Sequence, residues 1–142
     1  MKKIKKNSFT RIIESRVIQL IVNEYIRKKK FNIPIHLALG HECLSEAISL
    51  NIKKNDKIIC SHRNLHYQIA RDKNLKKILN EFSLLTKDGS SGNYGSMNLI
   101  NPTKGIIYTS SILGNNLSVA CGVSYSLKKT KNITFVITGD GA

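Results

Sequence analysis

The stretch NITFVITGDGA (residues 132–142) decides the fold class. Its first part, NITFVIT, is a nearly unbroken run of β-branched and aromatic residues, which is typical of a strand buried on both faces of a parallel sheet. The segment before it, NNLSVACGVSYSLKK (115–129), has the composition of a helix. A helix, a short connection and a buried strand make up half of an α/β unit, so we expect an α/β fold with a parallel sheet.

The tripeptide Gly139-Asp140-Gly141 follows this predicted strand directly. In open α/β sheets ligands bind beyond the carboxyl ends of the strands, so Asp140 falls where a site is expected. The glycines let the backbone come close to a phosphate or a metal. A carboxylate at that point suits a hard cation such as Mg²⁺. Taken alone the tripeptide decides nothing, because an ordinary tight turn after a strand has the same composition.

Three further helices are predicted from apolar periodicity. The first, TRIIESRVIQLIVNEYIRKK (10–29), is an amphipathic helix whose apolar residues are Ile13, Val17, Leu20, Ile21 and Tyr25. The second, ECLSEAISLNI (42–52), has an apolar side made of Cys43, Leu44, Ala47, Ile48 and Leu50. The third, LKKILNEFSLL (75–85), places Leu75, Ile78, Leu79, Phe82 and Leu85 on one face.

The remaining segments complete the expected order of elements. NDKIIC (55–60) is a turn into a short strand, and KDGSSGNYGS (87–96) is a loop. In the helix over 115–129 we expect close packing through its small residues, a cap from Asn115 or Asn116, and favourable charges at its C-terminus. The residues concerned are Ser118, Cys121 and Gly122 on the small side and Lys128 and Lys129 at the end.

Composition limits the class of protein. The chain has 142 residues, of which 41% are hydrophobic, so we expect a single domain with a hydrophobic core. No apolar run approaches the ~20 residues of a membrane span, and no apolar stretch follows the basic start, which argues against a secretory signal. Cys43, Cys60 and Cys121 lack metal-type spacing and are interpreted as reduced core thiols of a cytoplasmic protein.

The strong positive charge leaves one alternative open. Lys and Arg number 23 against 9 Asp and Glu, for a net charge of +14. A basic surface can bind nucleic acid, an anionic membrane or an acidic partner. The basic residues are scattered and are not interleaved with aromatic residues, so a nucleic-acid binder rests on charge alone. Binding to nucleic acid would weaken with added salt.

Five stretches stand in an order that is specific to one family. They are IPIHLALGHE (33–42), DKIICSHR (56–63), GSSGNYGSMNLI (89–100), SSILGNNLSVACG (110–122) and ITFVITGDGA (133–142). This series resembles the alpha subunit of the thiamine-diphosphate-dependent 2-oxo acid dehydrogenases, the decarboxylating component of pyruvate-, branched-chain- and acetoin-type complexes. The family pattern contains P-x-H-L-x-x-G-Q-E, an [HY]-R dipeptide, G-x-G-G-S-M-H, I-V-G-x-x-x-P-x-A-x-G and G-D-G-A. The resemblance runs from about Thr10 to Ala142, after a basic tail over residues 1–9.

The resemblance implies the thiamine-diphosphate-binding fold and a Mg²⁺ ion that holds the diphosphate of the cofactor. Asp140 matches the family's metal ligand, and Gly139, Gly141 and Ala142 match its backbone contacts. Ile112, Leu113 and Gly114 match the segment that passes under the aminopyrimidine ring.

Two further matches concern the phosphate end and the reaction itself. His62 and Arg63 match the dipeptide near the diphosphate, where the planar fork of an arginine binds phosphate bidentately. His36 matches the histidine that lines the cofactor channel, and we expect it to be catalytic, since a histidine there can steady the diphosphate or move a proton.

The implied activity is oxidative decarboxylation of a 2-oxo acid. The thiazolium ring carries the chemistry and protein groups position it, while the acyl fragment passes to a lipoyl-bearing acyltransferase. The family works with a beta subunit, which supplies the glutamate that activates the aminopyrimidine. Neither nucleic acid nor a membrane is an expected partner, and the expected location is the cytoplasm. Substrate identity stays open, because transketolase-type enzymes look much alike over this span.

Several positions depart from the family pattern. His41 replaces its Gln, Asn98 replaces the His of G-S-M-H, and Ser118 replaces a Pro. Leu65 stands where the family has a His two positions after the Arg, and His66 could replace it only after a shift of one residue. In the glycine-rich loop GNYG (92–95), Tyr94 replaces a glycine of the pattern.

These departures, with the missing downstream Asn that completes the metal site, support an alternative: a catalytically inactive remnant or interaction module of the family. We also expect the chain to be the N-terminal part of a longer domain.

Overall fold

The computed structural model describes residues 6–31, 33–72, 74–83 and 96–139. Its helices are α1 (Lys6–Arg27), α2 (Glu42–Asn51), α3 (Leu65–Arg71), α4 (Leu75–Ser83) and α5 (Asn115–Ser126). Its strands are β1 (Lys57–Ser61), β2 (Ile106–Ser110) and β3 (Thr134–Val136). Two single-turn 3₁₀ helices, η1 (Ser96–Asn98) and η2 (Pro102–Lys104), precede β2.

The strands form a parallel sheet in the order β2-β1-β3, with β1 in the centre. Ile58 of β1 pairs with Ile106 on one side, and Ile59 pairs with Val136 on the other. Ile58, Ile59 and Cys60 are 0% exposed, as expected for a strand with neighbours on both edges and helices on both faces. The α/β fold with a parallel sheet is therefore confirmed.

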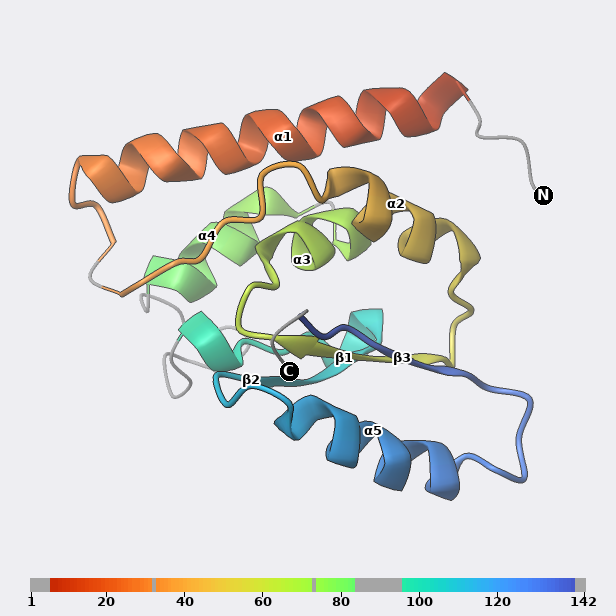
Figure 1. Cartoon of the computed structure of the whole chain (residues 1–142). Helices are drawn as coiled ribbons and strands as arrows, with labels where there is room; N and C mark the ends of the chain where they lie inside the picture. Colours follow the sequence, from red (N-terminus) through yellow and green to blue (C-terminus); the bar gives the residue numbers. More distant parts are fainter. Residues whose placement is uncertain (1–5, 32, 73, 84–95, 140–142) are drawn as a thin grey trace.

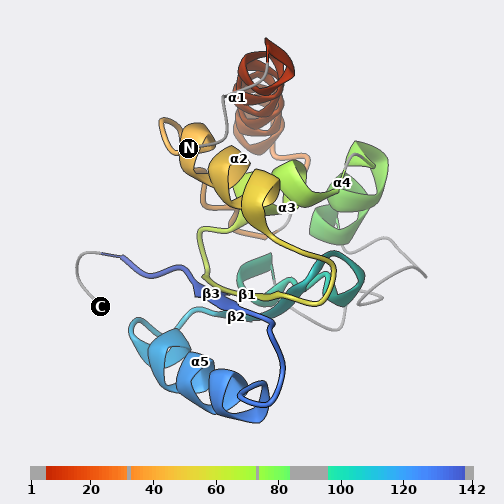
Figure 2. The ribbon, with the colours of Figure 1, turned by 90° about the vertical axis from the view of Figure 1, so that its right-hand side faces the viewer.

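Helices cover both faces of this sheet, as Figure 1 and Figure 2 show. α5 lies on one face, while α2, α3 and α4 lie on the other with α1 outermost. One core cluster, Val22, Leu65, Ile78 and Leu99, joins α1 to α3 and α4. A second cluster joins α3 to the sheet through Ile58, Cys60, Tyr67 and Ile106. α3 thus belongs to both cores and fixes the distance between the helical layer and the sheet.

The helix predicted at the N-terminal end is confirmed, but its predicted buried face is wrong. Ile13, Val17, Leu20, Ile21 and Tyr25 are between 42% and 47% exposed. The inward face carries Ser15, Gln19 and Val22, exposed by at most 5%. Polar and apolar residues are mixed around this helix, so no apolar stripe defines its orientation. The inward orientation is set instead by polar partners that lie far away in sequence.

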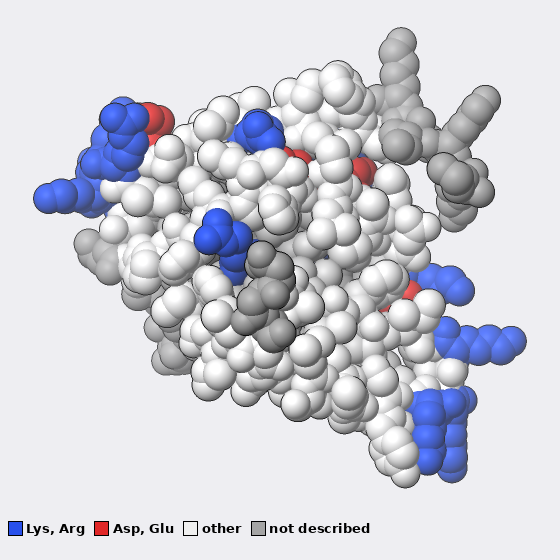
Figure 3. All heavy atoms as spheres, in the orientation of Figure 1, with Lys and Arg blue, Asp and Glu red and all other residues white. Residues whose placement is uncertain are grey.

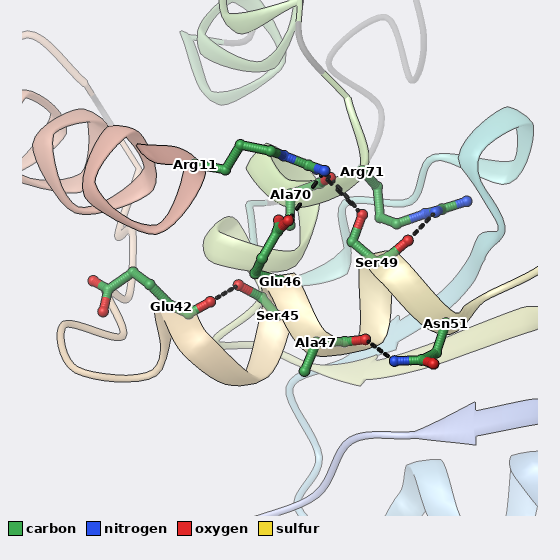
Figure 4. A network of polar contacts seen from close by, with 9 residues as sticks. All are labelled: Arg11, Glu42, Ser45, Glu46, Ala47, Ser49, Asn51, Ala70 and Arg71. Atoms are coloured by element: carbon green, nitrogen blue, oxygen red, sulfur yellow. Dashed lines mark hydrogen bonds and ion pairs between the residues drawn. The ribbon is translucent and has the colours of Figure 1, made fainter. Parts of the chain in front are cut away.

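The second helix is also confirmed, but of its predicted apolar side only Ile48 packs against a core cluster. Cys43, Leu44, Ala47 and Leu50 are exposed, whereas Glu42, Ser45 and Glu46 are at most 4% exposed. The reason is the polar network of Figure 4, in which Glu46 pairs with Arg11 of α1 at 3.1 Å.

The same network ties α2 to the end of α3. The guanidinium of Arg11 donates to Ala70 O at 3.0 Å, and the Ser49 hydroxyl donates to the same oxygen at 2.8 Å. Arg71 donates to Ser49 O at 3.5 Å (Figure 4) and to Lys104 O at 3.0 Å. Because these polar groups find partners inside, α2 can turn its apolar side chains outward.

The last helix and strand differ from expectation in several details. α5 is capped by Gly114, whose φ of 78° is left-handed, with no side-chain cap from Asn115 or Asn116. Asn115 instead accepts a hydrogen bond from the Tyr108 hydroxyl at 2.7 Å, and Asn116 donates to Ile137 O. The two asparagines thus bind α5 to the sheet.

Other expectations for this region are also wrong. Ser118, Cys121 and Gly122 are exposed rather than closely packed, and α5 ends at Ser126, before Lys128 and Lys129. Within the described residues β3 is an edge strand and is half-buried, not buried on both faces.

The structure adds two elements that sequence patterns did not predict, α3 and β2. It confirms the strand at β1 and the helix at α4, where Ile78 is 4% exposed. The side chains of Phe82 and Leu85 lie outside the described residues, as does most of the predicted loop over 87–96. All three cysteines are free, but Cys43 and Cys121 are exposed, so the predicted core role holds for Cys60 alone. No described helix combines the length and apolarity that crossing a membrane requires.

Candidate functional site

A pocket of about 500 Å³ opens at the carboxyl ends of β1 and β3. Its walls come from four segments that are distant in sequence, namely 38–44, 61–67, Leu113 and 137–139. Its size falls in the range that binds small molecules and cofactors. Its place is the one where open α/β sheets bind their ligands.

The structure brings several of the predicted site residues together here. His62, Arg63, Leu113 and Gly139 all line the pocket. The ring of His36 lies edge-on to that of His62, with 4.9 Å between ring centroids, just outside the lining.

Other predicted residues are placed elsewhere. Ile112 is 66% exposed and does not line the pocket, and Gly114 is the residue that caps the start of α5. Asp140, Gly141 and Ala142 lie outside the described residues, so the predicted metal ligand stays a prediction. Within the described ranges no group of three or more His, Cys, Asp or Glu side chains could hold a metal ion.

All four histidines of the chain gather at this pocket. His41 and His66 line it, with 6.2 Å between their ring centroids. From the sequence these two appeared only as departures from a family pattern. The sequence indicated a shared site for them only through composition, since all four histidines of the chain fall within residues 36–66.

The histidines carry buried nitrogens without a partner among the described residues. These are Nδ1 of His36, Nδ1 of His62, and both Nδ1 and Nε2 of His66. Buried polar atoms in folded proteins are nearly always hydrogen-bonded, and exceptions call for an explanation such as a ligand or a water. All four lie close to one pocket, where a ligand or an ordered water would supply the missing partner.

Burial, with the basic side chains nearby, keeps two of these rings neutral near pH 7. Burial lowers the pKa of His62, and His36 and Arg63 lower it further. The pKa of His66 falls to about 4, chiefly through burial and then through His41 and Arg63, with Glu42 opposing the shift. A neutral imidazole has one donor and one acceptor nitrogen, so each ring can still pair with an oxygen atom of a ligand.

Arg63 is held at the pocket wall by the loop that precedes α2. Its Nη1 donates to the backbone oxygen of Leu37 at 2.5 Å. Asn64 follows it and donates to Ser61 O and His62 O at 3.2 and 3.3 Å, which fixes the turn at the end of β1. The guanidinium is therefore positioned while the rest of its donors remain available to an anion.

Glu42 holds the loop that carries His41 into the pocket. It accepts two hydrogen bonds from Arg16 at 2.6 and 2.8 Å, one from Gln19 at 2.7 Å and one from Gly40 N at 3.0 Å. The hydrogen bonds from Arg16 lower the pKa of Glu42 to about 2. The loop is also held by Gln19, which accepts from Ala38 N at 2.9 Å. The chain turns at Gly40, whose φ of 101° disfavours a side chain.

Fold and pocket together define an α/β protein with a ligand site at the strand ends. A profile of the family described as "Dehydrogenase E1 component" matches residues 10–142, and the chain belongs to that family. α1 begins at Lys6, shortly before the matched region.

Curated relatives agree with this assignment. The alpha subunit of acetoin:2,6-dichlorophenolindophenol oxidoreductase of Bacillus subtilis (strain 168) is 26% identical over 94% of the chain and 41% of its own length. The alpha subunit of the mitochondrial pyruvate dehydrogenase E1 component of Dictyostelium discoideum is 27% identical over 94% of the chain and 36% of its own length. The corresponding Rickettsia typhi subunit is 31% identical over 75% of the chain and 33% of its own length. The matched region thus spans well under half of each relative.

Proposed function

We propose that this chain forms the alpha-subunit part of a thiamine-diphosphate site in a 2-oxo acid dehydrogenase that works with a beta subunit. One observation carries the proposal. His62 and Arg63, expected at the cofactor's diphosphate, lie with Leu113 and Gly139 around a single pocket at the strand ends. Family membership and the relatives named above support the same reaction class.

The residues at the pocket fit a diphosphate. The fork of Arg63 can bind two phosphate oxygens at once, and its hydrogen bond to Leu37 O keeps it in place. The Nδ1 atom of His62, which has no partner among the described residues, is a further hydrogen-bonding group for such an anion. Leu113 adds an apolar surface for a ring. When bound, thiamine diphosphate supplies the carbon nucleophile that permits decarboxylation, which no amino-acid side chain can provide.

The finer parts of the proposal follow from the sequence resemblance. Asp140 is the proposed Mg²⁺ ligand, a 2-oxo acid is the proposed substrate, and a lipoyl-bearing acyltransferase is the proposed acceptor of the acyl group. A beta subunit would complete the cofactor site, and the proposed location is the cytoplasm.

Calorimetric titration with thiamine diphosphate and Mg²⁺ tests this proposal, on the chain alone and with a candidate beta subunit. We expect binding that weakens at least tenfold in Arg63→Ala, since charge-assisted hydrogen bonds to phosphate are lost. Asp140→Ala should weaken it similarly. Arg27→Ala is the matched control, because Arg27 is an exposed arginine at the end of α1 that pairs, among the residues the structure describes, with Glu24 on its own helix. Equal weakening in all three variants, or no binding in either setting, would contradict the proposal.

One observation favours a second candidate, a family member that binds its partners without catalysis. Leu65, at the position of a family histidine, is 1% exposed within the helical core and presents no polar group to the pocket. Asn98, at another family histidine, is exposed in η1. Cofactor binding without CO₂ release from any 2-oxo acid tested would support this candidate against the first.

The basic surface does not concentrate at one groove in the view of Figure 3. Lys and Arg side chains gather there at two separate edges, one where α1 ends and the other near the end of α5. Nucleic-acid binding therefore gains no support from this view.

A further inference from the structure

His66 is a buried polar side chain in the first turn of α3. It is 2% exposed, yet it lines the pocket at the strand ends. Its ring centroid is 6.2 Å from that of His41 and 4.1 Å from that of Tyr67. Neither of its ring nitrogens has a hydrogen-bond partner among the described residues.

A structural role in the core does not explain this arrangement. A core histidine normally bonds at least one ring nitrogen to a backbone or side-chain group. The acidic group nearby, Glu42, is already committed to Arg16, Gln19 and Gly40 N. An apolar residue of similar size would fill the site without leaving two buried nitrogens unpaired, and replacing such groups is often neutral or stabilising.

The fold explains why this residue reaches the pocket. Leu65, one position earlier, points into the core shared by α1, α3 and α4. The helical turn from Asn64 onward then places the next side chain on the pocket side, next to Arg63. The guanidinium of Arg63 is the positive charge beside His66 in this pocket, and the charge of Glu42 is balanced by Arg16. A pocket with this lining favours an anion.

We propose that His66 is a ligand-contacting residue, which donates a hydrogen bond from one ring nitrogen to an anionic oxygen of the molecule bound in this pocket. The inference rests on the proposed function and assigns His66 to that same site. Two groups share the required chemistry, the diphosphate of the cofactor and the carboxylate of a 2-oxo acid. The second nitrogen then accepts a hydrogen bond from the ligand or from a water molecule.

The test compares His66→Leu with Ser15→Ala. Ser15 is a matched control, because its buried hydroxyl also has no partner in the described part of the chain, but Ser15 lines a different cavity, between α1 and the helices beneath it. Thermal unfolding of the full chain, alone and with the beta subunit, is measured without ligand, with inorganic pyrophosphate and with pyruvate. Long-range ¹⁵N–¹H spectra of the wild type report on the ring nitrogens of each histidine.

We expect His66→Leu to unfold at the same or a higher temperature than the wild type without ligand. It should bind one of the two probes about tenfold or more weakly, as expected for a lost hydrogen bond to a charged group. The same probe should shift a ring nitrogen of His66. Loss confined to pyrophosphate assigns the diphosphate, and loss confined to pyruvate assigns the carboxylate. Ser15→Ala should bind both probes as the wild type does.

The proposal is overturned if His66→Leu unfolds at a lower temperature and binds both probes normally, because His66 would then be a structural residue. It is also overturned if neither probe moves the ring nitrogens of His66. Failure of the proposed function gives a different result. Thiamine diphosphate would then not bind, while pyrophosphate or pyruvate binding would still depend on His66.

Discussion

Glu42 and His66 lie on neighbouring elements, and each is 2% exposed. Every available contact of Glu42 is filled, since it accepts hydrogen bonds from Arg16, Gln19 and Gly40 N. His66 has none on either ring nitrogen among the described residues. A buried polar group that is fully paired stabilises a fold, whereas an unpaired one loses stability that only a ligand or water can restore. Equal burial therefore conceals opposite roles.

The comparison predicts its largest effect for Glu42→Ala. This change leaves Arg16, Gln19 and Gly40 N without their common acceptor and releases the loop that precedes α2. We expect the free energy of unfolding to fall by about 3 kcal/mol or more, as in other buried pairs that lose one partner. Urea unfolding measures it.

Glu24→Ala is the control for that experiment. Glu24 also pairs with an arginine, Arg27, but both side chains are more than half exposed. Exposed pairs of this spacing contribute less than about 0.5 kcal/mol. If the two variants lost similar stability, the pairing of Glu42 would not be what holds the loop.

The second prediction concerns pH. The pKa of His66 is about 4 in the fold and 6.5 in a free histidine, so the unfolded chain binds more protons between these values. The free energy of unfolding should be highest above about pH 6.5 and should fall on acidification towards pH 4. Protonation of His66 should account for a loss on the order of 3 kcal/mol. His66→Leu should flatten this part of the curve.

Glu42 titrates in a separate and lower window, which lets the two roles be distinguished. Its pKa is lowered from 4.5 to about 2, so its contribution is present above about pH 4.5 and is lost as the pH falls towards 2. Unfolding free energies of the wild type and His66→Leu should therefore converge again in slope below pH 4. A pH curve of His66→Leu that matches the wild type throughout would contradict the assignment of the upper window.

Asp56 extends the comparison to a second paired carboxylate. It accepts hydrogen bonds from the backbone N–H groups of Lys53 and Ile133, each at 2.8 Å, and so joins the start of β1 to the start of β3. Asp56→Ala should lower the free energy of unfolding by about 2 kcal/mol, because two N–H groups lose a charged acceptor. Unfolding in urea measures this loss. A loss smaller than that of Glu24→Ala would mean that the hydrogen bonds of Asp56 do not stabilise the fold as those of Glu42 do.

The smallest effect is expected at Thr134 in β3, whose buried hydroxyl also finds no partner within the described ranges but lies away from the pocket. Thr134→Val removes that hydroxyl and keeps the shape of the side chain. We expect a change within about 0.5 kcal/mol and no effect on ligand binding, because no contact is lost. A large loss of stability would mean that a buried polar atom without a hydrogen-bond partner still stabilises this fold.

Sequence patterns predicted the parallel α/β fold because strands such as NITFVIT carry their signal in their own composition. They missed α3, which has only seven residues and becomes helical through the packing of Leu65 and Tyr67 in two cores. They also missed the short strand β2. The predicted buried faces of α1 and α2 were wrong. Gln19, Glu42 and Glu46 are buried because they pair with residues distant in sequence, which no local pattern reveals.

For the site, order of motifs predicted more than any single residue did. His62, Arg63, Leu113 and Gly139 do converge, although their roles stay predictions. His66 was treated as a residue shifted by one position, because alignment to a pattern cannot show which way a helix turns its side chains. Only the fold shows that the shift moves an imidazole into the pocket and a leucine into the core.

The order of strands in the sheet bears on how the chain is made. Asp56 and Ile133, which join the starts of β1 and β3, are 77 residues apart. At about 5–20 residues per second, a ribosome needs roughly 4–15 seconds to make the intervening chain. Throughout that time the nascent central strand, with Ile58, Ile59 and Cys60, has an edge without its final neighbour. A strand whose three central residues are completely buried in the folded chain therefore needs protection during synthesis until β3 has been made.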